Sequence, residues 1–164
     1  MVGVIVADQA VKLLATHFLD PLHPVRVIPA FFWLTLCYNT GAAFSMFRRH
    51  PSALTILNTI VTVLIVIWGI RLPRKEKRLR AALGLIAGGA SGNLIDRFFR
   101  GGHVVDFLDV HWFDKAHWPV FNLADTAICI GVGLIILDFL LHKKIKTEKQ
   151  LPKKGGNKNK PCKY

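Results

Sequence analysis

The sequence predicts an all-α membrane protein with four transmembrane helices and a small β-sheet at the outer membrane face. Three observations support this fold class. Of the 164 residues, 52% are hydrophobic, and residues 54–70 and 126–137 contain no charged side chain. The basic residues gather next to these apolar stretches. Uncharged stretches of this kind suit helices of about 20 residues that cross a bilayer.

The helices are expected at residues 2–18, 52–70, 81–98 and 121–142. The first connection, residues 20–51, is predicted to contain strands at 25–29 and 32–38, because both stretches are β-branched or aromatic and are interrupted by prolines. The second connection, residues 71–80, is short and basic. The third, residues 100–119, is rich in Gly, His and Trp. Residues 1–142 are expected to form one membrane domain, and the Lys-rich residues 143–164 a disordered cytoplasmic tail.

The distribution of positive charge predicts the orientation. Six of the 22 Lys and Arg residues fall in residues 71–80, and nine fall in the tail. Both stretches should be cytoplasmic by the positive-inside rule, so both termini lie inside and the loops 20–51 and 100–119 lie outside. Because the charge flanks apolar segments, the net charge of +12 does not indicate a nucleic-acid partner.

Small residues mark one helix, and no metal-ligand pattern is present. Gly84, Gly88 and Gly92 follow one another at intervals of four, a spacing that lets membrane helices approach closely.

The three cysteines are scattered, and the histidines of residues 100–119 lack helical ligand spacing. We therefore expect neither a metal nor a cofactor.

Two aspartates lie where an unpaired charge is costly. Asp106 follows Gly101-Gly102 just beyond the third helix, and Asp125 lies in the first turn of the fourth. Two carboxyl groups brought together can share one proton, so that one acts as an acid and the other as a base. The alternatives are that Asp106 is a solvated loop residue and that Asp125 is a structural residue at a helix N-terminus.

Further polar residues are predicted on the inner faces of the helices. Asn93, Asp96 and Arg97 share one face of the third helix. We expect Asn93 to reach a central cavity, and Asp96 and Arg97 to satisfy neighbouring buried groups. Asp8 and Lys12 are one turn apart on the first helix and are expected to form an ion pair at membrane depth.

Polar residues are also found in the fourth helix and in the loop before it. Asn122 and Asp125 share the first turn of the fourth helix. Asp109 and Asp114 are expected to be solvated. Asp138 is expected to snorkel to the membrane surface or to cap its helix.

Five motifs occur in the order found in lipoprotein signal peptidase (signal peptidase II), and the sequence resembles that family over roughly residues 5–135. The motifs are Asp8-Gln-Ala-Val-Lys12, Asn39-Thr-Gly-Ala-Ala-Phe44, Gly88-Gly-Ala-Ser-Gly-Asn93-Leu-Ile-Asp-Arg97, Val104-Val-Asp106-Phe and Phe121-Asn-Leu-Ala-Asp125. The family pattern also leads us to expect a short cytoplasmic segment before the first helix. It has no counterpart of the Lys-rich tail, to which we assign no catalytic role.

The resemblance implies an aspartic endopeptidase of the bacterial inner membrane. Its substrates would be prolipoproteins that carry diacylglycerol on a cysteine, and the enzyme would cut the peptide bond just before that cysteine. Its other partner would be membrane lipid, and the cyclic peptide globomycin would inhibit it. By the family pattern, Asp106 and Asp125 are the catalytic pair. The residues that would support this pair or hold substrate are Asn39, Asn93, Arg97 and Asn122. Those that would have structural roles are Asp8, Lys12 and Asp96.

A small proton-coupled transporter or channel subunit is the competing interpretation, because intramembrane Asp and Lys residues often line ion paths. Against it, the polar residues gather at the outer end of the helices, apart from those of the first helix. A structural scaffold protein would leave the carboxylates unexplained.

Overall fold

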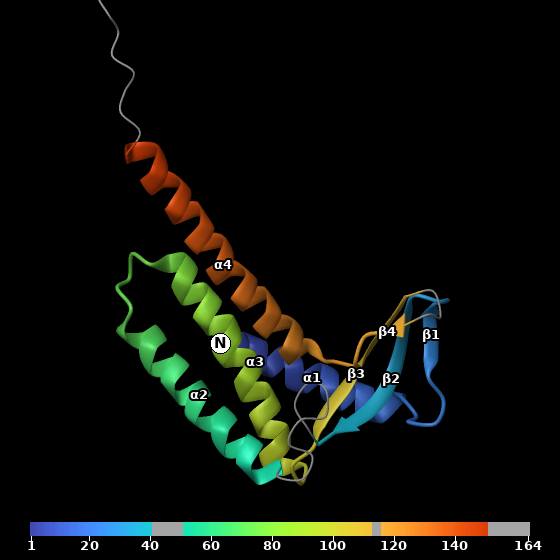
Figure 1. The fold of residues 1–164 in the computed structure, drawn as a ribbon. Coiled ribbons are helices and arrows are strands. Elements are labelled where there is room, and N and C mark those ends of the chain that lie inside the picture. The colour runs from blue at the N-terminus through green and yellow to red at the C-terminus, as the bar shows by residue number, and fades with distance from the viewer. Residues whose placement is uncertain (41–50, 113–115, 151–164) are drawn as a thin grey trace, which may run out of the picture.

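The computed structural model describes residues 1–40, 51–112 and 116–150. Within these ranges the chain forms four helices and four strands, shown in Figure 1. The helices are α1 (Val2–Phe18), α2 (Pro51–Arg71), α3 (Lys77–Phe99) and α4 (Leu123–Gln150). The strands are β1 (Val25–Ile28), β2 (Phe32–Asn39), β3 (Val104–Trp112) and β4 (Ala116–His117).

Two helix boundaries differ from expectation by several residues because charged residues were assigned to loops, and the others agree to within two residues. Helix α3 begins at Lys77, although the sequence predicted residue 81. Helix α4 continues to Gln150, so the backbone of residues 143–150, expected in a disordered tail, is helical. Lys, Arg, Glu and Gln are all good helix formers, and none of them ends a helix. Residues 151–164 of the predicted tail lie outside the described residues.

Among the residues that the structure describes, two helical segments are long and apolar enough to cross a membrane, by length and composition. They are Ser52–Arg71 of α2 and Leu123–Leu141 of α4. Helices α1 and α3 carry more polar and charged residues, and for them the crossing stays a prediction. The large apolar side chains of α2 and α4 are mostly exposed, as expected for helices that face lipid.

Helix α3 is the centre of the helical layer and contacts α1, α2, α4 and β3. Figure 1 shows it between α2 and α4. Its glycines permit this packing: a Cβ on Gly88 would lie 2.8 Å from Val4 Cβ of α1, and one on Gly89 would overlap the backbone oxygen of Ala124 in α4. The small-residue stripe is therefore confirmed as the site of close helix approach.

The four strands form one antiparallel sheet in the order β1-β2-β3-β4. The sequence predicted β1 and β2, but β3 and β4 were missed because residues 100–119 are rich in Gly, His and Trp. The sheet packs on α1 through a buried cluster. The members of this cluster are Ala15, Leu36, Val105 and Phe107. Asp106 lies on β3, opposite Cys37 of β2, and only 2% of its surface is exposed, so it is not a solvated loop residue.

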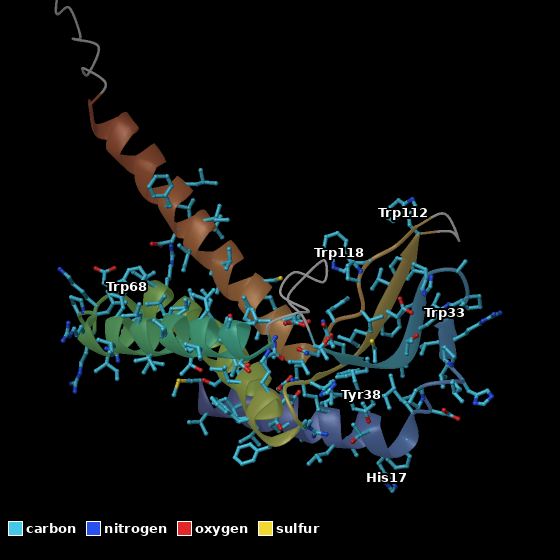
Figure 2. The ribbon with its side chains drawn as sticks, turned by 60° about the horizontal axis from the view of Figure 1, so that its bottom comes forward. His17, Trp33, Tyr38, Trp68, Trp112 and Trp118 are labelled. Carbon is cyan, nitrogen blue, oxygen red and sulfur yellow. The ribbon has the colours of Figure 1, made fainter. Side chains whose placement is uncertain are left out.

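Tryptophans lie at both ends of the molecule. Figure 2 shows Trp33, Trp112 and Trp118 at the end that carries the sheet, and Trp68 at the opposite end of the helices. Trp68, Trp112 and Trp118 are each at least half exposed. Trp side chains favour both membrane–water interfaces, so their positions fit a protein that spans the bilayer with its sheet at one surface.

Candidate active site

Asp106 is buried on β3, where two side-chain amides hold its carboxylate. Asn39 Nδ2 donates to Oδ2 at 3.0 Å, and Asn122 Nδ2 donates to Oδ1 at 2.7 Å. Burial raises the pKa of Asp106 from 3.8 to about 7, and the negative charge of Asp125 adds to this rise, while the two amide hydrogen bonds oppose it. A carboxyl group with such a pKa can hold a proton near neutral pH and release it during a reaction.

Asp125 occupies the first turn of α4, where it forms a reciprocal cap with Asn122. The Asp125 backbone N–H donates to Asn122 Oδ1 at 3.0 Å, and the Asn122 backbone N–H donates to Asp125 Oδ2 at 3.3 Å. This exchange satisfies backbone donors at a helix start that would otherwise lack partners. Asn93 Nδ2 donates to the other carboxylate oxygen at 2.8 Å. The side chain of Asp125 is partly exposed, unlike that of Asp106.

Asn122 connects the two aspartates. Its side-chain amide reaches Asp106, and its backbone N–H reaches Asp125. The same amide also donates to Asn93 Oδ1 at 3.1 Å and to the Val105 backbone oxygen at 3.2 Å. Asn122 is fully buried, so these bonds form out of contact with water. The two aspartates, 19 residues apart in the sequence, thus belong to one hydrogen-bonded network.

A buried ion triad, made by Asp8, Lys12 and Asp96, lies below this network. Lys12 Nζ is 2.9 Å from Asp8 Oδ2 and 2.9 Å from Asp96 Oδ2, and all three residues are fully buried. The ion pair between Asp8 and Lys12 expected from their spacing is confirmed. Lys12 Nζ also donates to Asn93 Oδ1 at 2.9 Å, so the triad is joined to the site above it.

Arg97 lies beside the site. Its Nη1 donates to the Asn93 backbone oxygen at a long 3.5 Å, and its buried Nε has no hydrogen-bond partner among the described residues. Its charge interacts with Asp125 and Asp106. Both Asp96 and Arg97 were expected to satisfy neighbouring buried groups. Asp96 does so, because it accepts hydrogen bonds from Val105 N and Gln9 Nε2.

Gln9 is the residue that the sequence reasoning missed. Its Nε2 donates to Asp8 Oδ2 at 3.3 Å, to the Gly92 backbone oxygen at 3.1 Å and to Asp96 Oδ1 at 3.2 Å. It therefore helps to hold α1 against α3. The available signal was its place beside Asp8 in an otherwise apolar helix, where a polar amide needs partners.

Asp109 was expected to be solvated, and this prediction is wrong. It lies on β3 with 6% of its surface exposed, accepts a hydrogen bond from Thr35 Oγ1 at 2.8 Å and lies 3.1 Å from His111 Nε2. Asp138 is partly exposed near the middle of α4, with its carboxylate 3.9 Å from Arg78 Nη1. Asp114 lies outside the described residues.

The site offers acid–base chemistry by carboxyl groups held by amides. Within residues 1–40, 51–112 and 116–150, the structure contains no cluster of three or more His, Cys, Asp or Glu side chains arranged to hold a metal ion. Of the predicted residues, the structure brings together both aspartates, all three asparagines and the ion triad, with Arg97 beside them.

The comparisons with known proteins identify the family. The model of the family described as signal peptidase (SPase) II matches residues 1–141. The chain belongs to the signal peptidase II family. The lipoprotein signal peptidase of Pseudomonas putida is 43% identical over 86% of this chain and 84% of the relative. That of Coxiella burnetii is 44% identical over 84% of this chain and 85% of the relative.

The fold agrees with this membership. A bacterial membrane enzyme solved by the in meso method at 2.3 Å resolution has a TM-score of 0.76 and 30% identity, over 96% of this chain and 91% of that one. This member of the signal peptidase II family is therefore a bacterial membrane peptidase that removes signal peptides from prolipoproteins. The transporter alternative is not supported.

Proposed function

We propose that the protein is an aspartic endopeptidase in which Asp106 and Asp125 form the catalytic pair and share one proton. The observation that carries the proposal is the position of Asn122, which donates hydrogen bonds to both carboxylates from one residue. The raised pKa of Asp106 supports a division of roles, with Asp106 as the protonated acid and Asp125, at a helix N-terminus, as the ionised base.

The reaction then needs only these two groups and a water molecule. Asp125 removes a proton from water, and the water oxygen attacks the carbonyl carbon of the scissile bond. Asp106 gives its proton to the carbonyl oxygen, which produces a tetrahedral diol. When the diol collapses, the carbon–nitrogen bond breaks and the nitrogen takes the proton that Asp125 received. The diol returns a hydroxyl proton to Asp106, so the pair is restored.

The amides and Arg97 take supporting roles in this proposal. Asn39, Asn93 and Asn122 hold the carboxylates, and each donates a hydrogen bond to one or both of them. Arg97 has a buried Nε without a partner among the described residues, which leaves it able to bind a peptide carbonyl of the substrate.

We infer that the substrate is a precursor already carrying diacylglycerol, cut just before the modified cysteine. The sheet lies at one end of the helices beside the candidate site, where a lipid-anchored chain could enter laterally while water still reaches Asp125. This end would face outward from the bacterial inner membrane, with both termini in the cytoplasm. Globomycin would inhibit by occupying the same site as the substrate.

The test is cleavage of a diacylglyceryl-modified precursor by purified variants. Asp106→Asn and Asp125→Asn should each lose activity by at least about 10²–10⁴-fold, because each removes a group that transfers a proton. Asp138→Asn is the matched control, since its carboxylate lies 13 residues beyond Asp125 on α4, beside Arg78, and it should retain wild-type activity. Near-normal turnover by either dyad variant, with normal folding, would contradict the assignment.

A further inference from the structure

We propose that the buried triad of Asp8, Lys12 and Asp96 positions the two catalytic aspartates relative to one another, in addition to stabilising the fold. This inference rests on the proposed function, because it assumes that Asp106 and Asp125 act as a pair. It assigns the three residues a role as positioning residues for the reaction, which goes beyond the structural role that the sequence suggested.

The two carboxylates of the triad bind equivalent points on the two catalytic segments. Asp8 Oδ1 accepts a hydrogen bond from the backbone N–H of Ala124 at 2.9 Å. Ala124 is the residue immediately before Asp125. Asp96 Oδ2 accepts a hydrogen bond from the backbone N–H of Val105 at 3.1 Å, and Val105 is the residue immediately before Asp106. Each catalytic aspartate therefore follows a backbone group that is tied to one carboxylate of the triad.

Lys12 joins these two anchors. Its ammonium group lies 2.9 Å from both Asp8 Oδ2 and Asp96 Oδ2. The separation between the start of α4 and strand β3 is consequently set through a single cation. Because Asp8 lies on α1 and Asp96 on α3, the reference points belong to two long helices, separate from β3 and the first turn of α4, which carry Asp106 and Asp125. Sites supported by regular elements hold their geometry more closely than sites supported by loops.

The third hydrogen bond of Lys12 sets the orientation of an amide. An ammonium group has three donors and no acceptor, so the atom it contacts on Asn93 must be the oxygen, Oδ1, at 2.9 Å. The amide nitrogen of Asn93 must then point the other way, and there it donates to Asp125 Oδ1 at 2.8 Å. Lys12 thus uses all of its donors, and one of them determines which end of Asn93 faces the base.

Stability alone explains this arrangement poorly. All three charged residues are fully buried, and removing ions from water costs as much as their mutual attraction returns, so apolar replacements of buried ion pairs are often neutral. The packing also makes room for the triad: a Cβ on Gly92 would lie 2.5 Å from Asp8 Oδ2, so only glycine lets Asp8 reach this position. A role in geometry accounts for both features.

Several charged groups face the dyad and enter its pH dependence. Lys12 from α1 and Arg97 from α3 both interact with it electrostatically. Asp109, also on β3, is instead engaged by Thr35 Oγ1 at 2.8 Å and lies 3.1 Å from His111 Nε2. A change in the triad that moves Asp106 and Asp125 apart weakens their mutual repulsion, so the two apparent pKa values of the pair draw together.

The experiment compares two substitutions at each anchor, Asp96→Ala with Asp96→Asn and Asp8→Ala with Asp8→Asn. Alanine removes the acceptor of the backbone hydrogen bond, whereas asparagine keeps it. We expect the alanine variants to lose about 10²-fold in kcat, because a shift of about 1 Å in a catalytic group has this effect. KM should change by less than about threefold, since the anchors do not contact substrate, and asparagine should restore most of kcat.

The pH profile separates positioning from a general loss of structure. If the distance between the two carboxylates increases by about 2 Å, at an effective dielectric constant of about 20, their repulsion falls by about one pKa unit. The pH range between the two limbs of the bell-shaped kcat/KM profile should then narrow by about one pH unit. Leu83→Ala is the matched control, because Leu83 is buried in α3 beside Gly69, and its loss lowers stability without touching the anchors. It should leave the width of the bell unchanged.

The outcomes distinguish the two proposals. A wild-type profile without a bell, or active Asp106→Asn protein, overturns the proposed dyad itself. A wild-type bell with anchor variants that keep both its width and kcat overturns the positioning role alone. If an alanine variant does not fold, the asparagine variant at the same position still tests the idea. It keeps the acceptor for the backbone N–H and should therefore retain most of kcat and the wild-type width of the bell, and loss of both would overturn the positioning role. An equal effect of Leu83→Ala would also overturn it.

Discussion

The burial of Asp106 predicts that the wild-type protein becomes less stable as pH rises, and that Asp106→Asn removes this loss. The folded-state pKa is raised from 3.8 to about 7, so between these values the folded protein binds more protons than the unfolded chain. Stability from this group is complete below pH 3.8 and is lost as pH rises to about 7. A rise of about three pH units corresponds to about 4 kcal/mol at 1.36 kcal/mol per unit.

The substitution has a cost of its own. In Asp106→Asn the amide oxygen can still accept the hydrogen bond from Asn122, but the new NH₂ group faces the NH₂ group of Asn39, whose amide must turn over. We allow about 1 kcal/mol for this rearrangement. The variant should then be more stable than the wild type by about 3 kcal/mol at pH 8 and by only about 0.5 kcal/mol at pH 5.

Thermal unfolding of purified protein in detergent measures this difference. For a chain of this size, about 3 kcal/mol corresponds to a rise in Tm of roughly 6–12 °C at pH 8. Asp138→Asn, with its partly exposed carboxylate, should keep the pH dependence of the wild type. An Asp106→Asn protein that loses stability between pH 5 and pH 8 as steeply as the wild type would refute the reasoning.

Three further predictions concern the reaction and the topology. The rate kcat/KM should follow a bell with pH, because the active dyad holds one proton and either adding a second or losing the first stops the reaction; a rate that rises steadily until the protein unfolds would indicate a single base. A strong chelator should leave cleavage unchanged, since two carboxyl groups suffice to activate water, and restoration of lost activity by Zn²⁺ would contradict this. A cysteine introduced at Lys75, in the basic connection between α2 and α3, is tested in a protein whose native Cys37, Cys129 and Cys162 are replaced by serine. It should react with a membrane-impermeant reagent only after the cells are opened, and labelling of intact cells would reverse the proposed orientation.

The sequence was most informative where composition and spacing have one physical meaning. The helix predicted at residues 2–18 has these bounds in the structure. Asp8 and Lys12 form an ion pair because residues four apart lie about one helical turn from each other. The glycine stripe of α3 likewise marks where neighbouring helices approach. These features depend on local periodicity, which can be read without knowing the rest of the fold.

Features that depend on long-range pairing were not predictable. Strand β3 looks like a loop by composition, and becomes a strand because β2 supplies its hydrogen bonds from about 70 residues away. Asp109 was predicted to be solvated because β3 was taken for a loop, whereas in the structure it accepts a hydrogen bond from Thr35 of β2. The hydrogen bonds of Asp8 with Ala124 and of Asp96 with Val105 could not be predicted. Each donor is a backbone N–H, which nearly every residue has, so the residue type does not indicate the contact.

The dual use of Asn122 restricts which amino acids position 122 can accept. Serine, threonine, aspartate and asparagine all begin helices well, because each offers an oxygen to the first turn. Asn122 must also present an N–H to Asp106, 2.7 Å away, while its oxygen receives the Asp125 backbone. Serine and threonine lack this second donor, and aspartate would replace the amide with a third carboxyl group. Folding and proton chemistry therefore select asparagine together, and a substitution that satisfies one requirement alone cannot be neutral.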